Sequence, residues 1–265
     1  MFGLYKDGNM GKIKVSIITV CYNSEKTIER TISSVLDQTY DKIEYIIVDG
    51  ASTDRTIEII NRFRGEFGDR LKVISEKDDG IYYAMNKGIE LATGELIGII
   101  NSDDWYEKDA VEKIVEVYEK NSDNRYAVYY GKTGTVRDGI VCEVNMSDHD
   151  ELEDNMISHP SCFVTKDTYT DKGKFDTKYI SVADYDFMLR LKRSGDVSFI
   201  PVREHIANFS LGGMCSTSAA YIDLLKLKMN YGKISTIRGR IEIAKAKLAE
   251  TMIKHGLKPI QLRKK

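Results

Sequence analysis

Residues 14–50 read KVSIITVCYNSEKTIERTISSVLDQTYDKIEYIIVDG, and this stretch decides the fold class. It opens on a β-branched apolar run at 14–20 and ends on a second apolar run at 43–49. Between them, residues 25–37 carry apolar side chains at helical spacing. A helix between two short apolar runs predicts a strand–helix–strand unit, whose strands pair in parallel through a right-handed crossover.

The same alternation continues to residue 120. We expect helices at 53–67, 81–92 and 107–120 and strands at 71–75 and 95–100. A parallel sheet of this kind is buried on both faces, and its ligands bind at the carboxyl ends of its strands. The sequence therefore predicts an α/β fold with a mostly parallel sheet flanked by helices.

The second half of the chain changes character and predicts a mixed region packed against the first half. Strands are expected at 126–131 and 161–165, with a hairpin that turns at Asp138-Gly139. Helices are expected at 183–194 and over 218–255.

The composition is that of a globular protein. The chain has 265 residues, of which 42% are apolar and 30% charged, and this excludes a disordered or collagen-like chain. Its four cysteines are irregularly spaced with no C-x-x-C, which argues against a zinc site or a disulfide scaffold and fits the reduced thiols of a cytoplasm. Because no apolar run reaches the length of a membrane span, we expect a cytoplasmic protein.

The charge of the chain is unevenly distributed. The segment 223–265 carries 12 Lys and Arg against 3 Asp and Glu, so it has a charge of +9 and leaves −11 for the rest. One face of the expected tail helix is apolar, formed by Ile237, Ile241, Ala244, Leu248 and Met252. Three roles stay open for this basic helix: a solvated face, contact with anionic lipid at the inner face of the plasma membrane, or a protein partner. Nucleic-acid binding is disfavoured because the acidic body would repel phosphates.

Polar and acidic residues follow the expected strands. Asn101-Ser102-Asp103-Asp104 comes directly after the strand at 95–100, where a divalent cation such as Mg²⁺ or Mn²⁺ would relieve the repulsion between carboxylates and could bridge to a diphosphate. The alternative is that Asp103 or Asp104 caps the next helix. Asp49 and Asp78 also follow strands, and such acids commonly accept hydrogen bonds from a ribose or a base. The sequence has neither G-x-G-x-x-G nor a P-loop, so a nucleotide would be held in another way.

An ordered set of motifs resembles the inverting family-2 glycosyltransferases of the GT-A fold, especially bacterial enzymes of surface-polysaccharide synthesis. The set consists of TVCYNSEKTIERTISSVLDQTY (19–40), YIIVDGASTDRT (45–56), DDGIYYAMNKGI (78–89), LIGIINSDDWY (96–106), HPSCFVTKDTY (159–169), ADYDFMLRL (183–191) and FSLGGMCS (209–216). The resemblance covers residues 14–216.

The resemblance implies a role for individual residues. The nucleotide pocket, with the base and the ribose, would be lined by Thr19, Tyr22, Asn23, Asp49, Asp78 and Asn101. Asp103 matches the metal-binding acid of the D-x-D motif, and Asp184 matches the catalytic base. On the acceptor side, His159 is as well explained by a structural role as by contact with the acceptor. Trp105 is a candidate for stacking on a sugar because aromatic rings offer apolar faces.

The sequence departs from the family pattern at three positions. Asn101 replaces the first acid of D-x-D, and Ala183 stands where a glutamate often precedes the base, so Asp186 is the rival of Asp184. Met85 occupies a position that is often arginine, and Lys87 would then supply positive charge near the phosphates.

The resemblance divides the chain into a leader at 1–12, a GT-A domain at 13–216 and a basic helical extension at 217–265. The domain itself would consist of a nucleotide-sugar half at 13–106 and an acceptor half at 107–216. The expected function is metal-dependent, inverting transfer of a sugar, with UDP as the expected carrier, to a hydroxyl of a glycan or polyprenyl-linked glycolipid. A sugar-phosphate nucleotidyltransferase and a non-catalytic nucleotide-sugar or glycan-binding protein are the alternatives.

Overall fold

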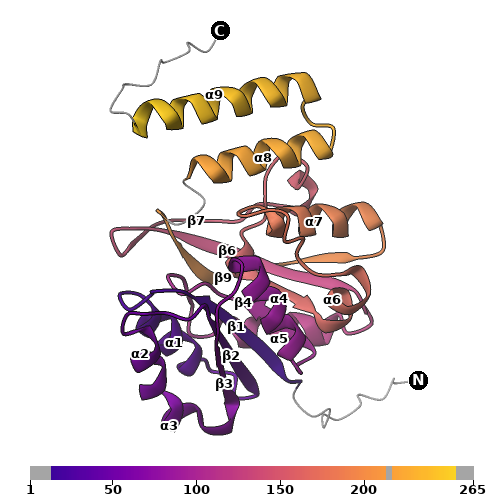
Figure 1. Cartoon of the computed structure of the whole chain (residues 1–265). Helices are drawn as coiled ribbons and strands as arrows, with labels where there is room; N and C mark the ends of the chain where they lie inside the picture. The colour runs from indigo at the N-terminus through magenta and orange to yellow at the C-terminus, as the bar shows by residue number, and fades with distance from the viewer. Residues whose placement is uncertain (1–12, 213–216, 255–265) are drawn as a thin grey trace, which may run out of the picture.

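The computed structural model describes residues 13–212 and 217–254, and Figure 1 shows the order of their helices and strands. The strands are β1 Val15–Cys21, β2 Ile43–Asp49, β3 Leu71–Ser75, β4 Leu96–Ile99, β5 Trp105–Tyr106, β6 Ala127–Arg137, β7 Ile140–Asn145, β8 Cys162–Thr165 and β9 Ser198–Ser210. The α-helices are α1 Ile28–Leu36, α2 Thr56–Arg62, α3 Arg64–Phe67, α4 Ile81–Leu91, α5 Ala110–Lys120, α6 Lys166–Lys172, α7 Ala183–Ser194, α8 Ser218–Asn230 and α9 Thr236–Lys254.

One mixed sheet organises the molecule. Its strand order is β3-β2-β1-β4-β8-β6-β9-β5, and β7 pairs with β6. The first four strands pair in parallel, with Val15 of β1 opposite both Ile43 of β2 and Leu96 of β4. The strand β8 then runs antiparallel between β4 and β6. The predicted parallel strand–helix–strand units are therefore confirmed, and the second half of the chain extends the same sheet.

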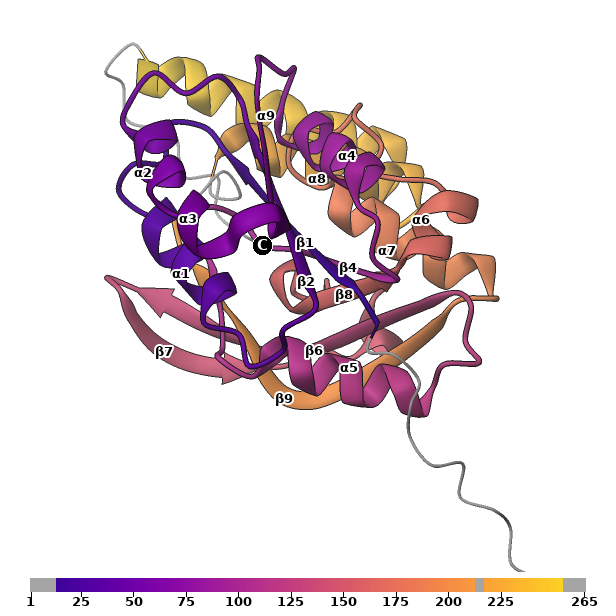
Figure 2. The same ribbon diagram turned by 90° about the horizontal axis from the view of Figure 1, so that it is seen from below.

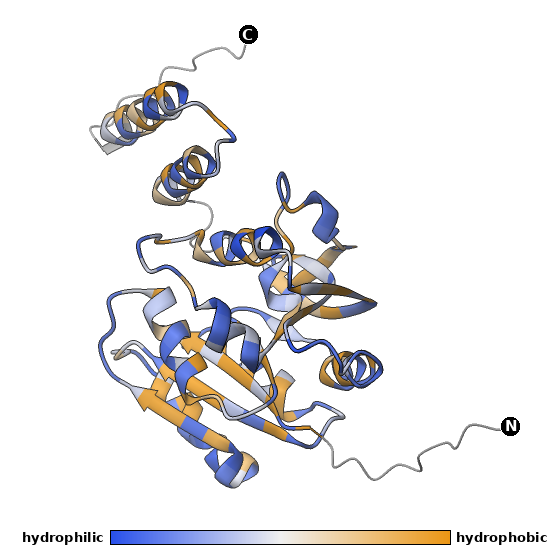
Figure 3. Ribbon diagram, turned by 90° about the vertical axis from the view of Figure 1, so that its right-hand side faces the viewer, coloured by the Kyte–Doolittle hydropathy of each residue, from blue (hydrophilic) through white to orange (hydrophobic). Residues whose placement is uncertain are grey.

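Helices cover both faces of this sheet (Figure 2). Neighbouring residues of a strand point to opposite faces, so Ile17 packs in the core beneath α1, α2 and α5, while Ile18 packs in the core beneath α4 and α7. The residues of β1, β2 and β4 are all buried, as expected for parallel strands covered on both sides. Figure 3 shows these strands as the most hydrophobic part of the ribbon.

The structure differs from the sequence-based expectation in its second half. The strand expected at 126–131 and the first arm of the hairpin form one strand, β6. The turn lies where it was predicted, since Asp138 and Gly139 both have positive φ, at 52° and 80°. The 13-residue strand β9 was not predicted; it contains Pro201 and pairs with β6 through register shifts, so its pattern does not alternate regularly.

The region expected to be helical from 218 to 255 is a helical hairpin of α8 and α9. Gly232 breaks it with a φ of 71°. Hydrogen bonds from α8 and from Tyr231, the residue that follows it, attach this helix to the body of the protein. Asp223 accepts from the backbone N–H of Ile180 at 2.5 Å, Tyr231 donates to Asp186 at 3.0 Å, and Asn230 donates to the Tyr179 hydroxyl at 2.9 Å.

We expect Asp223→Ala to lower the free energy of unfolding by about 1–3 kcal/mol. Asp223 is only 1% exposed, so its removal leaves the N–H of Ile180 without a hydrogen-bond acceptor at a buried position. Urea unfolding of the whole chain measures this. Asp223→Asn is the control: it keeps an acceptor for Ile180, gives up the ion pair with exposed Lys226, and should cost less than alanine. Equal losses for the two variants would contradict this account of how α8 is attached.

Candidate active site

A cleft of about 1180 Å³ opens at the carboxyl ends of the parallel strands. Its walls come from the loops that follow β1, β2, β3 and β4, from the start of α4, from residues 156–160 before β8, and from residues 180–184 at the start of α7. Phe209 and Ser210 at the end of β9 also line it. The cleft therefore lies where a parallel sheet is expected to bind its ligands.

Short hydrogen bonds lock together the loops that form the floor of this cleft. Asn23, after β1, has a positive φ of 50° and accepts from the N–H of Thr53 at 2.9 Å. Ser24 lies 2.8 Å from the hydroxyl of Ser102, which follows β4. Ala51, after β2, has a φ of 60°, a backbone conformation that is unfavourable for a residue with a Cβ. Such strain persists only where neighbouring contacts hold the loop, and it is common at binding sites.

The residues that follow β4 supply the cleft with two groups that suit a cation or a hydroxyl. Asn101 and Asp103 both line it. The Oδ1 atom of Asn101 is buried and has no hydrogen-bond partner among the described residues, while its amide donates to Asp104 at 3.4 Å. Burial raises the pKa of Asp103, against the opposing effects of its own backbone N–H and of Arg30. A cation at this position would favour the ionised carboxylate.

Asp104 has a structural role instead. It is fully buried, and its Oδ1 accepts from the backbone N–H of Ser210 at 2.8 Å, which ties β9 to the loop after β4. Burial, with a smaller contribution from Asp103, raises the pKa of Asp104 to about 8. It does not cap the next helix, because α5 begins at Ala110.

Asp184 lies across the same cleft, in the first turn of α7. Its Oδ1 accepts from the Tyr82 hydroxyl at 2.8 Å and from the backbone N–H of Tyr185 at 3.0 Å. Within the described part of the chain, Oδ2 makes no hydrogen bond. The carboxylate is thus oriented by two donors while one oxygen remains open to a ligand.

Two further polar side chains line the cleft near Asp184. Burial lowers the pKa of His159, against the opposing effect of Asp184, which favours the neutral form of this cleft-lining imidazole. Its ring packs edge-on against Phe175 at 5.7 Å. The Ser181 hydroxyl is buried without a hydrogen-bond partner in the part of the chain that is described. A substrate hydroxyl would satisfy it.

The structure brings seven of the residues singled out in the sequence into one cleft. They are Tyr22, Asn23, Asp78, Asn101, Asp103, His159 and Asp184. In particular, Asp103, the expected metal-binding acid, and Asp184, the expected base, line the same cleft although they are far apart in sequence.

Five other residues singled out in the sequence do not line the cleft, and three of these are sealed into the protein. Thr19 is fully buried, and its hydroxyl accepts a hydrogen bond from the Tyr45 hydroxyl at 2.9 Å. Asp49 is fully buried, and its oxygens accept from Ser52 and from Ser75. Asp186 is 3% exposed, and its carboxylate accepts hydrogen bonds from Arg190 and Tyr231. Of the two acids considered for the base, Asp184 lines the cleft and Asp186 does not.

The other two residues have partners elsewhere. Lys87 forms an ion pair with Glu76 at 2.5 Å and does not line the cleft. Trp105 is covered by the guanidinium of Arg30, whose Cζ lies 3.4 Å from the ring centroid. One face of the Trp105 ring is therefore already covered, and its expected role in stacking on a sugar stays a prediction.

Sequence reasoning missed the parts of the cleft that only three-dimensional contact reveals. The Tyr82 hydroxyl orients Asp184, and the buried Ser181 hydroxyl was not singled out from the sequence. Lys26 and Lys77 line the cleft in place of Lys87. Tyr82 and Lys26 lie within the motif stretches quoted above, but their place in the cleft depends on segments that are distant in sequence.

The charge of the cleft also bears on its ligand. Its described lining contains five carboxylates, from Glu25, Asp54, Asp78, Asp103 and Asp184, against two lysines. Arg55 compensates one of them, at 3.2 Å from Glu25. A diphosphate would meet a surplus of negative charge here, which a divalent cation would offset.

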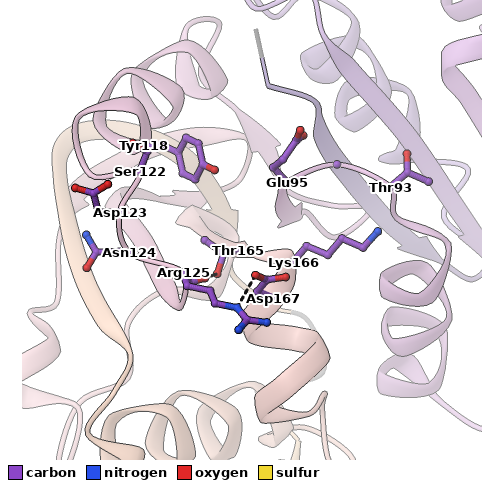
Figure 4. Close-up of a pocket in the computed structure, with 11 residues that line it drawn as sticks. Thr93, Glu95, Tyr118, Ser122, Asp123, Asn124, Arg125, Thr165, Lys166 and Asp167 are labelled. Carbon is purple, nitrogen blue, oxygen red and sulfur yellow. Dashed lines mark hydrogen bonds and ion pairs between the residues drawn. The ribbon is translucent and has the colours of Figure 1, made fainter. Parts of the chain in front are cut away.

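A second, smaller cavity of about 410 Å³ lies at the opposite edge of the sheet, where β4 and β6 begin (Figure 4). Arg125 on its wall is paired with Asp167 at 2.9 Å, as the dashed line in Figure 4 marks. It contains none of the residues that the sequence singled out. The cleft at the carboxyl edge is therefore the candidate active site.

Comparison with known proteins shows to which family this chain belongs. Residues 16–186 match the family model for glycosyl transferase family 2. The chain belongs to this family. It is a glycosyltransferase, and the nucleotidyltransferase and non-catalytic alternatives are set aside.

Two relatives show how far the similarity extends. The chain is 30% identical over 178 residues to a PGL/p-HBAD biosynthesis glycosyltransferase of Mycobacterium tuberculosis, an alignment that covers 66% of this chain and 68% of that protein. It is 31% identical over 196 residues to the hyaluronan synthase of Pasteurella multocida, covering 72% of this chain but 20% of that protein.

Solved structures share the fold. TarS of S. aureus, in complex with UDP-GlcNAc, aligns with a TM-score of 0.65 at 20% identity over 81% of this chain and 65% of that chain, just under two thirds. The mannosyltransferase PcManGT of Pyrobaculum calidifontis, in complex with GDP-Man and Mn²⁺, aligns with a TM-score of 0.62 at 18% identity over 91% and 70%. The expected GT-A fold is confirmed.

Proposed function

We propose that this family-2 enzyme is a metal-dependent inverting glycosyltransferase, which moves a sugar from a nucleoside diphosphate to a hydroxyl of a glycan or glycolipid. One observation carries the proposal: the carboxylates of Asp103 and Asp184 line a single cleft at the carboxyl edge of the sheet. Residues 13–106 would hold the donor and residues 107–216 the acceptor, with 217–265 as an extension.

Asp184 would act as the general base. An inverting transfer is a single displacement, so the proton of the acceptor hydroxyl must be removed on the face opposite the leaving group. Tyr82 and the N–H of Tyr185 hold Oδ1 of Asp184, which presents Oδ2 to the acceptor. Ser181 and His159, on the same wall, would hydrogen-bond acceptor hydroxyls.

Asp103 would hold the metal, with Asn101 contributing its unpartnered Oδ1 to the metal or to the ribose. When bound, a divalent cation would stabilise the negative charge that develops on the departing nucleoside diphosphate. The protein offers few ligands of its own: the one group of three metal-ligating side chains within 13–212 and 217–254 is Asp148, His149 and Asp150, which do not line the cleft. A cleft that offers Asp103 and Asn101 as ligands suits Mg²⁺ or Mn²⁺, which are commonly held by one or two carboxylates plus phosphate oxygens.

Tyr22, Asn23 and Asp78 would bind the nucleotide, because they line the end of the cleft formed by the loops after β1 and β3. The ring of Tyr22 is 64% exposed there and free to stack on a base. We propose UDP as the carrier, which is supported by a fold shared with a protein solved with UDP-GlcNAc. We propose a glycan or a polyprenyl-linked glycolipid as the acceptor, and the relative named hyaluronan synthase supports the glycan.

A panel of nucleotide sugars tests the donor. We expect one UDP-sugar with Mn²⁺ to raise the Tm of the whole chain by about 5 °C at concentrations of about 100 times its Kd, since a ligand stabilises the folded state by mass action. GDP- and dTDP-sugars are the matched controls and should raise it less. A Tm that no nucleotide sugar moves, or that moves equally after chelation of the metal, would contradict the proposal.

A further inference from the structure

The helix α9 has two apolar faces, and among residues 13–212 and 217–254 only one of them packs against another element. It lies outermost in Figure 1, on the far side of α8 from the sheet. Its inner face packs closely on α8: a Cβ added to buried Gly239 would lie 2.2 Å from the sulfur of Met229. Ile243 and Ala246 are partly buried on the same side. Close packing of this kind fixes which way the other face points.

The outer face of α9 carries a row of exposed aliphatic side chains. Ile237, Ile241 and Leu248 are 75%, 49% and 59% exposed, and exposed Ala244 lies between them. At about 100° per residue, these four positions fall on one narrow stripe of the helix. We call it the α9 stripe. Single exposed aliphatic residues are common, but an aligned row marks an interaction surface.

Basic residues border the α9 stripe on both sides. Helical geometry places Arg240 and Lys247 along one edge and Arg238 and Lys245 along the other, and all four are exposed. The acidic residues of the helix lie beyond these edges, where Glu242 pairs with Lys245 at 2.9 Å. The pattern is an apolar strip in a positively charged frame.

We propose that the α9 stripe and its basic edges dock on an anionic lipid bilayer. Aliphatic side chains at the centre would enter the boundary between headgroups and acyl chains, while long basic side chains at the edges would reach the phosphates. A second copy of the chain fits less well, because stripe-to-stripe contact would bring the basic edges together. No helix of the described residues is long and apolar enough to cross a membrane, so the contact would lie in the plane of the surface.

Hydrogen bonds connect the docking surface, through α8, to the candidate active site. Asp223 of α8, the helix on which α9 packs, accepts a hydrogen bond from the N–H of Ile180. Both Ile180 and Asp184 line the cleft. Tyr231, after the same helix, bonds Asp186 of α7. A bilayer bound at α9 would therefore hold the cleft at a fixed height above the lipid surface, where a lipid-linked acceptor would be presented.

Sedimentation with vesicles tests the proposal on the whole chain. We expect binding to vesicles of phosphatidylcholine with phosphatidylglycerol and little binding to phosphatidylcholine alone. The double variant Ile237→Glu, Leu248→Glu should weaken binding at least about tenfold, and Arg240→Gln with Lys247→Gln should do so as well, since both apolar contact and charge contribute. Ile140→Glu on β7, at a residue 68% exposed, is the matched control and should bind like the unchanged protein.

Three results would overturn the proposal. The first is no binding to anionic vesicles, the second is equal binding by the stripe variant, and the third is binding that does not depend on phosphatidylglycerol. Sedimentation equilibrium adds a further arm: a dimer that the stripe variant converts to monomer would make this face an interface between copies. Turnover with a water-soluble acceptor should be unchanged in the stripe variant, so a failure here is distinct from a failure of the proposed transferase mechanism.

Discussion

Asp184→Asn is expected to lower turnover by about 10²–10⁴-fold, the usual contribution of a general base. Asparagine can still accept from Tyr82 and from the N–H of Tyr185, so the local structure should persist, but an amide cannot take the acceptor's proton. Binding of the donor should remain, because the lost group faces the acceptor. Turnover with saturating donor and a titration of donor affinity measure the two effects separately.

Asp186→Asn is the matched control, because it changes an acid of the same helix that does not line the cleft. Its carboxylate is bonded to Arg190 and Tyr231, so this variant should lose stability while the folded molecules keep their turnover. Retained turnover in Asp184→Asn, or abolished turnover in folded Asp186→Asn, would remove the assignment of the base.

Asp103→Ala should remove the dependence of donor binding on Mn²⁺ and lower turnover by at least about 10²-fold, the scale seen when one preorganised stabilising group is lost. The reason is the charge of the cleft: its surplus of carboxylates repels a diphosphate unless a cation accompanies it. Calorimetric titration of UDP with and without Mn²⁺ measures the first effect, and a metal titration of turnover measures the second.

Ser102→Ala is the neighbouring control. Ser102 also lines the cleft, but its hydroxyl faces Ser24 at 2.8 Å and is not expected to bind a cation. This variant should keep the response to Mn²⁺. An Asp103→Ala protein whose UDP affinity still rises with Mn²⁺ as in the unchanged enzyme would place the metal on other residues.

Local sequence pattern was enough for the regular part of this protein. The apolar runs at 14–20 and 43–49 and the helical spacing between them predicted the parallel core, because the two faces of a buried strand or helix impose their period on neighbouring residues. The same pattern located the edge of the sheet where Asp103 lies. The resemblance to a family then singled out Asp184, which local pattern alone does not distinguish from a helix cap.

Contacts between distant segments decided the rest. Nothing near Asp49 or Asp186 in the sequence shows that these acids are buried and hydrogen-bonded to Ser75 and Tyr231. Asp184, by contrast, lines the cleft and is held by Tyr82, which is 102 residues away in the sequence. The composition of α9 likewise gave a basic helix, but only its packing on α8 showed which apolar face is left over. Periodicity is a property of neighbouring residues, while exposure and pairing depend on which segments meet, and that is set by the fold as a whole.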